Sequence, residues 1–128
     1  MGSQTAKMEI IETDKAFSQV SVEQGAYVAF TAYADNDAVK LQNGSEPVIG
    51  LEAVRRSMEG AKGTLKWNPF FADAAESEDL GYTIGDWELI LQDQLGVSHH
   101  SKGNYITIWK KQTNGKWKWV FDSGTQKV

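Results

Sequence analysis

The stretch Leu80-Gly81-Tyr82-Thr83-Ile84-Gly85-Asp86-Trp87-Glu88-Leu89-Ile90-Leu91 decides the fold of this sequence. It is rich in β-branched and aromatic residues, and this composition predicts one long strand over residues 80–91. Gly81 and Gly85 lack a side chain and mark places where such a strand can bend. The stretch therefore predicts a curved sheet with a long central strand.

Further strands are predicted on both sides of it. Residues 65–71 alternate with a period of two, and Pro69, which has no N–H to donate, indicates an edge strand. Residues 105–111 and 117–122 are the last two strands, joined through the turn pair Asn114-Gly115, and residues 92–102 are a polar connection. A short strand over residues 38–41 precedes a second turn pair, Asn43-Gly44.

The first half of the chain predicts three helices. Apolar residues at helical spacing indicate a first helix from about Ala6 to Gln19. Ser21 and Gln24 form a capping-box pattern that would start a second helix, ending near Tyr33. Residues 51–58 are the third helix. Because helices come first and antiparallel strands follow, we expect an α+β domain over residues 8–128, with residues 1–7 a flexible N-terminal segment.

Composition narrows the possible partners. The chain has 128 residues, 41% of them hydrophobic, a net charge of −4 and no cysteine. The acidic balance argues against nucleic acid or an anionic membrane as a partner, and the absence of cysteine excludes disulfides and thiolate metal sites. No apolar run has the length of a membrane-spanning helix. The sequence is compatible with two compartments: the cytoplasm, or an exported protein whose leader has been removed.

Four motifs follow one another along the chain: Tyr33-Ala34-Asp35-x-Asp37-Ala38-Val39, Gly44-Ser45-Glu46-Pro47-x-x-Gly50, Asp79-Leu80-Gly81-Tyr82-Thr83-x-Gly85-x-Trp87-Glu88, and Gly103-x-Tyr105-x-Thr107-x-Trp109-Lys110-Lys111 continuing to Asn114-Gly115-Lys116-Trp117-Lys118. In this order they resemble the SnoaL-like branch of the nuclear transport factor 2-like superfamily, which includes the ketosteroid isomerases. The resemblance implies a cone in which three helices pack on the concave face of a strongly curved antiparallel sheet. It also implies a small-molecule pocket, no cofactor, and a homodimer.

The same resemblance tests one specific activity. Matching to the ketosteroid isomerases places their proton-abstracting Asp at Leu41, their oxyanion-binding Tyr at Phe17, and their protonated Asp at Thr107. Leucine cannot accept a proton and phenylalanine cannot donate one. Steroid isomerisation by that mechanism is therefore not expected here.

Candidate site residues follow from the matched strands. Asp122 is the first candidate acid or base, because a carboxylate in an apolar cleft has a raised pKa. The alternative is that Asp122 ends the last strand at the rim, hydrogen-bonded to backbone or to Tyr105. Asp86 is the second candidate, unless the bend at Gly85 turns it outward. The predicted pocket-facing residues are Tyr82, Ile84, Asp86, Thr107, Val120 and Asp122.

Aromatic and histidine residues complete the list. Trp67 and Trp109 are equally compatible with core positions and with pocket walls that suit a ring-bearing ligand. His99 and His100 are adjacent, point to opposite faces of a strand and lack a third ligand, so no metal site is expected.

Two functions remain open. The first is a small-molecule-binding pocket protein that performs cofactor-free isomerase, cyclase or hydrolase chemistry on an apolar or ring-bearing ligand. In it Asp122 acts as acid or base, and the pocket residues are Trp67, Tyr82, Ile84, Tyr105, Thr107, Trp109 and Val120. The second is a non-catalytic ligand carrier or dimerisation domain.

Overall fold

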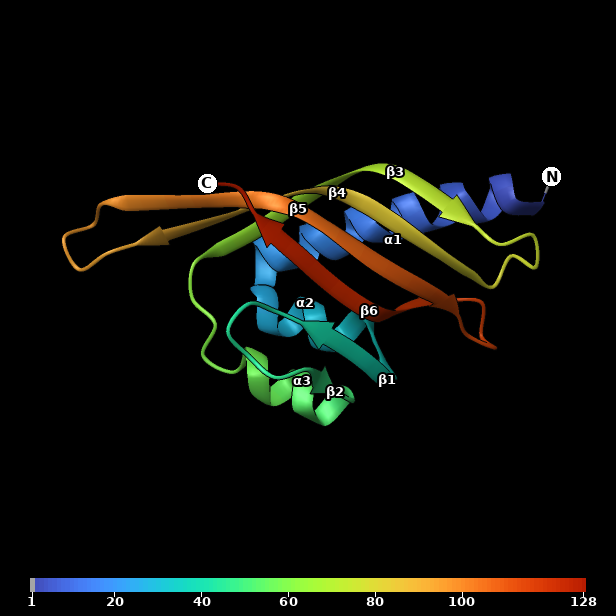
Figure 1. Ribbon diagram of the computed structural model, residues 1–128, viewed down its shortest axis with the longest axis horizontal. Helices are drawn as coiled ribbons and strands as arrows, with labels where there is room; N and C mark the ends of the chain where they lie inside the picture. The colour runs from blue at the N-terminus through green and yellow to red at the C-terminus, as the bar shows by residue number, and fades with distance from the viewer. Residues whose placement is uncertain (1) are drawn as a thin grey trace.

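A computed structural model describes residues 2–128 and shows three helices on one face of a six-stranded curved sheet (Figure 1). The chain is thus an α+β fold with its helices on the concave side, as the order of helical and strand patterns predicted. The elements in chain order are α1 (Gly2–Gln24), α2 (Ala26–Tyr33), β1 (Ala34–Leu41), β2 (Val48–Ile49), α3 (Leu51–Met58), β3 (Thr64–Ala74), β4 (Leu80–Gln92), β5 (Ser98–Lys111) and β6 (Trp117–Gln126).

The helix α1 corrects the predicted boundary between the first two helices. It begins at Gly2, and Ala6 is part of the core. It also runs through the predicted capping box without a break: Ser21 is buried inside the helix and donates a hydrogen bond to the Leu65 carbonyl at 2.6 Å. The break comes at Gly25, whose φ of 96° suits glycine. A tertiary contact to β3 therefore replaces the expected local cap.

The sheet is mixed instead of purely antiparallel. Its strand order is β2-β1-β6-β5-β4-β3, and β1 pairs with β6 in parallel while the other pairs are antiparallel. The strand β3 lies at the edge, as Pro69 predicted. The polar connection predicted over residues 92–102 is wrong, because β4 and β5 continue as a long hairpin with its turn at residues 93–97. Figure 1 shows this hairpin projecting beyond the helices.

Two bulges interrupt the antiparallel pairs of the described strands. One lies between Pro69 and Phe71 on β3, opposite Gly85 and Ile84. The other lies on β6, where Trp119 pairs with Trp109 and Phe121 pairs with Ile108, so Val120 is an extra residue. Because bulges bend and twist a strand, they contribute to the curvature that opens the sheet into a cone.

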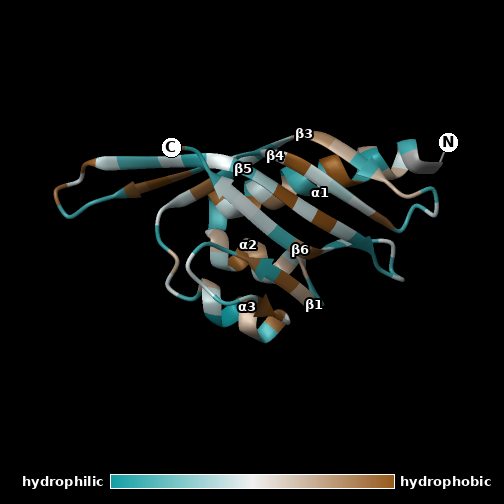
Figure 2. Cartoon of the chain, viewed as in Figure 1, coloured by the Kyte–Doolittle hydropathy of each residue, from teal (hydrophilic) through white to brown (hydrophobic). Residues whose placement is uncertain are grey.

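The core lies between α1, α2 and the concave face of the sheet. Trp109 and Trp119 are fully buried there, and Phe17 packs edge-to-face on Trp109 with 5.7 Å between ring centroids. Along β5 every second residue from Gly103 to Trp109 is buried, as expected for a strand with one covered face. Hydropathy also alternates along this strand (Figure 2), but its most hydrophobic residues, Ile106 and Ile108, lie between the buried positions and are only partly buried on the opposite face. The aromatic cluster fills the narrow part of the cone and leaves its wide end to the site described next.

Candidate functional site

A cavity of about 270 Å³ opens at the wide end of the cone. Apolar side chains from α1, α2 and β3 form one side of it, notably Phe17, Phe30 and Trp67. Strands β1, β5 and β6 form the other side and bring in its polar groups. The lining residues are Phe17, Phe30, Lys40, Leu41, Gln42, Asn43, Met58, Leu65, Trp67, Trp87, Tyr105, Thr107, Asp122, Ser123, Gly124, Thr125 and Gln126.

Asp122 is the carboxylate of this cavity. Its side chain is only partly exposed, lines the cavity and accepts a hydrogen bond from Thr107 Oγ1 at 2.8 Å. Burial raises the pKa of Asp122 to about 6, although the Thr107 hydrogen bond and the charge of Lys40 act in the opposite direction. A carboxyl group with this pKa exchanges its proton near neutral pH, as general acid–base catalysis requires.

The bulge at Val120 explains why Asp122 faces inward. Trp119 faces the core, so strict alternation along β6 would place Phe121 inside and Asp122 outside. The extra residue shifts the inward–outward alternation of β6 by one position, so Asp122 faces inward and pairs with the inward-facing Thr107. Val120 itself lies in the bulge and does not line the cavity, which corrects its predicted position.

The predicted faces of β4 are reversed. Thr83 is fully buried on the concave side, so its neighbours Tyr82 and Ile84 lie on the outer face, where Tyr82 packs on the half-exposed Phe71. Asp86 is also outside, with 58% of its side chain exposed. None of the three lines the cavity. The prediction that Tyr82, Ile84 and Asp86 share one face of β4 is correct, but that face is the outer one and not the one that faces the cavity.

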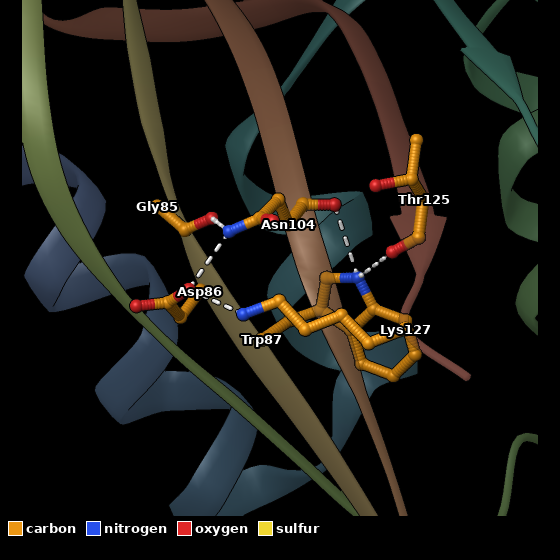
Figure 3. Close-up of polar contacts among 6 residues, drawn as sticks. All are labelled: Gly85, Asp86, Trp87, Asn104, Thr125 and Lys127. Atoms are coloured by element: carbon orange, nitrogen blue, oxygen red, sulfur yellow. Dashed lines mark hydrogen bonds and ion pairs between the residues drawn. The ribbon is translucent and has the colours of Figure 1, made fainter.

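Figure 3 shows the surroundings of Asp86 and of its neighbour Trp87. Asp86 accepts a hydrogen bond from Asn104 Nδ2 at 2.8 Å and lies 3.7 Å from Lys127 Nζ. The Trp87 indole N–H donates to the Asn104 and Thr125 carbonyls at 3.1 and 3.0 Å. Asp86 therefore belongs to a surface polar cluster, whereas Trp87 lines the cavity.

The sequence left Trp67 and Trp109 open between core positions and pocket walls; in the structure Trp109 belongs to the core and Trp67 lines the cavity. Trp109 is core: it is fully buried, donates its indole N–H to Thr83 Oγ1 at 3.1 Å and does not line the cavity. Trp67 lines the cavity and also packs on Phe17, with 4.6 Å between ring centroids. Trp67 is thus part of the aromatic wall of the cavity.

Asp14 on α1 was missed by the sequence reasoning. It is fully buried, and it accepts hydrogen bonds from Trp67 Nε1 at 2.9 Å and from Tyr105 Oη at 2.7 Å. Burial raises the pKa of Asp14, and the hydrogen bonds from Tyr105 and Trp67 partly counteract this. Tyr105 lines the cavity as predicted, but its hydroxyl is directed to Asp14 and not to Asp122. An acidic residue among the apolar positions of a predicted helix was the available signal.

Lys40 on β1 is the second residue that was missed. It lines the cavity, and its Cα pairs with that of Asp122 on the neighbouring strand. The signal for it was weak, because the parallel pairing of β1 with β6 cannot be deduced from either strand alone.

Among residues 2–128, no group of three or more His, Asp or Glu side chains could hold a metal ion. No helix within the same range combines the length and the apolar character that crossing a membrane requires. His99 and His100 instead lie near Asp93 and Glu88, each at 2.9 Å.

Comparison with known proteins identifies the fold. No protein-family model and no curated protein sequence matches this chain. Solved structures do match it. A ketosteroid isomerase-like protein from Erwinia carotovora atroseptica is 13% identical with a TM-score of 0.76, over 93% of this chain and 95% of that one. A nuclear transport factor 2-like superfamily protein from Salmonella enterica is 17% identical with a TM-score of 0.74, over 98% and 93%.

The association domain of CaMKII from C. elegans has the same fold, at 15% identity and a TM-score of 0.71, over 96% of this chain and 97% of that one. The chain therefore has the nuclear transport factor 2-like fold that its motifs predicted. Phe17, Leu41 and Thr107, the positions matched to the isomerase machinery, all line the cavity. Two of them carry no group that can take part in proton transfer.

Proposed function

We propose that the protein binds a small apolar or ring-bearing molecule in this cavity and transforms it by cofactor-free acid–base chemistry, with Asp122 as the acid or base. The observation that carries the proposal is a carboxyl group with a pKa of about 6 that lines an otherwise largely apolar cavity. Above that pH Asp122 is ionised and accepts a proton; below it the carboxyl group donates one.

The neighbours of Asp122 support this role. Thr107 holds one carboxylate oxygen at 2.8 Å, which fixes the side chain relative to the cavity. Trp67, on β3, contributes an aromatic ring to the lining of the same cavity, so a ring-bearing ligand could contact it within the space that Asp122 lines.

The volume of the cavity limits the size of the ligand. Its volume of about 270 Å³ lies just below the roughly 300–1,000 Å³ of typical ligand pockets. A molecule with one or two rings suits this space better than a steroid. This agrees with the loss of the isomerase groups at Phe17 and Leu41.

A thermal-shift screen tests the proposal. The wild type, Asp122→Asn and Asp86→Asn would be screened against small lactones, aromatic acids, aromatic polyketides and steroids. A ligand at 100 times its dissociation constant adds about 2.7 kcal/mol to the stability, which raises Tm by several degrees. We expect a one- or two-ring compound to stabilise the wild type and the matched surface variant Asp86→Asn equally.

Turnover of the hit then separates an enzyme from a carrier. Hydrogen exchange between the bound compound and deuterated water, followed by mass spectrometry, reports proton transfer without assuming the product. Exchange catalysed by the wild type and lost in Asp122→Asn supports acid–base chemistry. Binding without any exchange contradicts it and supports a ligand carrier. No stabilisation by any class contradicts a ligand-binding role altogether.

The second candidate function is a non-catalytic association domain. One observation favours it: the same fold occurs in the association domain of CaMKII from C. elegans. A homodimer of this chain is part of both functions, and sedimentation velocity of the purified protein would measure it directly.

A further inference from the structure

Lys40 lines the cavity, and the proposed function assigns it no role. Its side-chain nitrogen donates to Gln42 Oε1 at 2.8 Å and to Met58 Sδ at 3.2 Å, and it lies 5.6 Å from the centroid of the Phe30 ring. Lysine is among the residues least often found inside proteins, and it usually has a partner of opposite charge when it is buried. Its place in the wall of a largely apolar cavity therefore requires an explanation.

No direct ion pair holds the Lys40 side chain in its protonated form. Among the described residues, no carboxylate oxygen lies within 4.0 Å of Lys40 Nζ. Burial lowers the pKa of Lys40, because an ammonium ion is poorly solvated among apolar side chains, and the more distant charge of Asp122 opposes that shift only in part. A lysine in such surroundings is more often a neutral amine than a surface lysine is. The lone pair of a neutral amine is a nucleophile.

An acid lies beside this amine on the neighbouring strand. Lys40 and Asp122 are Cα partners in the parallel pair of β1 and β6, and both line the cavity. Burial raises the pKa of Asp122 and lowers that of Lys40. Moving one proton from the ammonium group to the carboxylate removes both charges, so burial shifts the pair toward a neutral amine and a protonated carboxyl group. The cavity thus has a nucleophile and an acid on adjacent strands.

We propose that Lys40 forms an imine with a small aromatic aldehyde that enters the cavity, and that Asp122 supplies the protons that this condensation requires. The inference rests on the ligand pocket and the acid–base role of Asp122 in the proposed function, and it adds a covalent activity and a substrate class. The carbonyl carbon of an aldehyde is little hindered, which suits a nitrogen in contact with the side chains of Gln42 and Met58. The aromatic wall that includes Trp67 suits the ring.

Atoms and protons balance in this step. The Lys40 Nζ lone pair attacks the carbonyl carbon, one carbon–oxygen bond opens, and the oxygen takes the proton of the Asp122 carboxyl group. Asp122 then removes one proton from the nitrogen of this carbinolamine and returns it to the hydroxyl group. The hydroxyl group leaves as water while the nitrogen lone pair forms the carbon–nitrogen double bond. The products are one water molecule and a protonated imine beside the ionised Asp122, and no oxidant or reductant is consumed.

Reductive trapping tests the inference. The purified protein would be mixed with benzaldehyde, 4-methoxybenzaldehyde or 4-hydroxybenzaldehyde together with sodium cyanoborohydride, which reduces an imine to a stable secondary amine. These probes have no hydrogen on the carbon next to the carbonyl, so enolisation does not contribute to the signal. Peptide mass spectrometry then gives the rate of labelling at Lys40 and at the exposed Lys110 of β5 in the same sample.

We expect Lys40 to be labelled about tenfold faster than Lys110 or more, because the cavity holds the aldehyde beside the amine and a positioned acid assists the reaction. Lys40→Arg should lose the cavity adduct, since a guanidinium group keeps the charge but is not a nucleophile here. The matched control Lys110→Met should leave the labelling of Lys40 unchanged. Thermal unfolding of each variant shows that it is folded.

A second reagent isolates the role of Asp122. Acetic anhydride acylates neutral amines without an acid, so its rate at Lys40 measures the neutral amine in each variant. Asp122→Asn removes the acid and also the negative charge that favours the ammonium form of Lys40. The ratio of trapping to acetylation at Lys40 should therefore fall about tenfold or more in Asp122→Asn, even where the amine itself becomes more reactive.

The failures of the two proposals differ. Labelling of Lys40 no faster than that of Lys110, in a protein that binds and exchanges a compound of the thermal-shift screen, overturns the imine and leaves the proposed function intact. An unchanged ratio of trapping to acetylation in Asp122→Asn overturns the part assigned to Asp122 in the condensation. Fast trapping at Lys40 without hydrogen exchange in any screened compound supports the imine and contradicts the proposed acid–base turnover. If no adduct forms and no screened compound binds, both proposals fall.

Discussion

Replacing Asp122 with asparagine should stabilise the protein, and by an amount that depends on pH. The folded state raises the pKa of Asp122 to about 6 from its ordinary value of 3.8. Between these values the folded protein binds the proton more tightly than the unfolded chain, so the stability of the wild type falls as pH rises through this range. Asparagine has no such titration and its amide oxygen can still accept the hydrogen bond from Thr107.

The size of the effect follows from the two pKa values. The ionised carboxylate lowers the free energy of unfolding by about 1 kcal/mol at pH 4.5 and by about 3 kcal/mol at pH 7.5. For a domain of this length, about 3 kcal/mol corresponds to a difference of roughly 10 °C in Tm. Asp122→Asn should therefore be more stable than the wild type, with a gap that widens by about 2 kcal/mol between these two pH values.

Urea denaturation at pH 4.5, 6.0 and 7.5 measures this gap. Asp14 also has a raised pKa, and its charge contributes to the raised pKa of Asp122; because Asp14 is present in both proteins, the effect of its own burial cancels in the comparison. Asp86→Asn is the matched control for the same change of residue outside the cavity, because 58% of the Asp86 side chain is exposed. A gap that stays constant with pH, or an Asp122→Asn variant less stable than the wild type at pH 7.5, would refute the reasoning.

Three further changes test the surroundings of the cavity. Trp109→Ala should lower the free energy of unfolding by about 3–5 kcal/mol in urea denaturation, because it empties the narrow part of the cone. Asp14→Ala should cost about 1–3 kcal/mol for each buried donor left unpaired, and adding Tyr105→Phe should recover part of that loss in a double-mutant cycle. Gly103→Ala should lower Tm through a clash with the Thr125 carbonyl, by about 1 kcal/mol of stability or more, and unchanged thermal unfolding would contradict that contact.

The sequence predicted the elements of this fold better than their faces. The helix over Leu51–Met58 and the edge position of β3 were predicted from local signals, namely apolar spacing and the missing N–H of Pro69. The capping box at Ser21 failed because that hydroxyl bonds to β3 instead of starting a helix. Local patterns are reliable where no distant backbone competes for the same group.

The candidate site shows the same division. Asp122 lines the cavity as the matched strands predicted, and Trp67, which the sequence left open between core and pocket wall, lines it as well. The face of β4 was assigned wrongly, because alternation defines two sides without saying which one the helices cover. Lys40 and Asp14 were not predicted as site residues because each is surrounded by segments that lie far away in the sequence. Parallel pairing and helix–sheet packing decide these contacts, and neither has a local signature.

The bulge at Val120 has a consequence for comparing this chain with its structural neighbours. It divides β6 into a segment before Val120 whose inward tryptophans fill the core and a segment after it whose inward residues line the cavity. A related hairpin without the extra residue is one position shorter there but keeps the same pairing on both sides. An alignment without a gap at Val120 would match the inward Asp122 to an outward residue, so functional residues can be transferred along this strand only after the gap is placed.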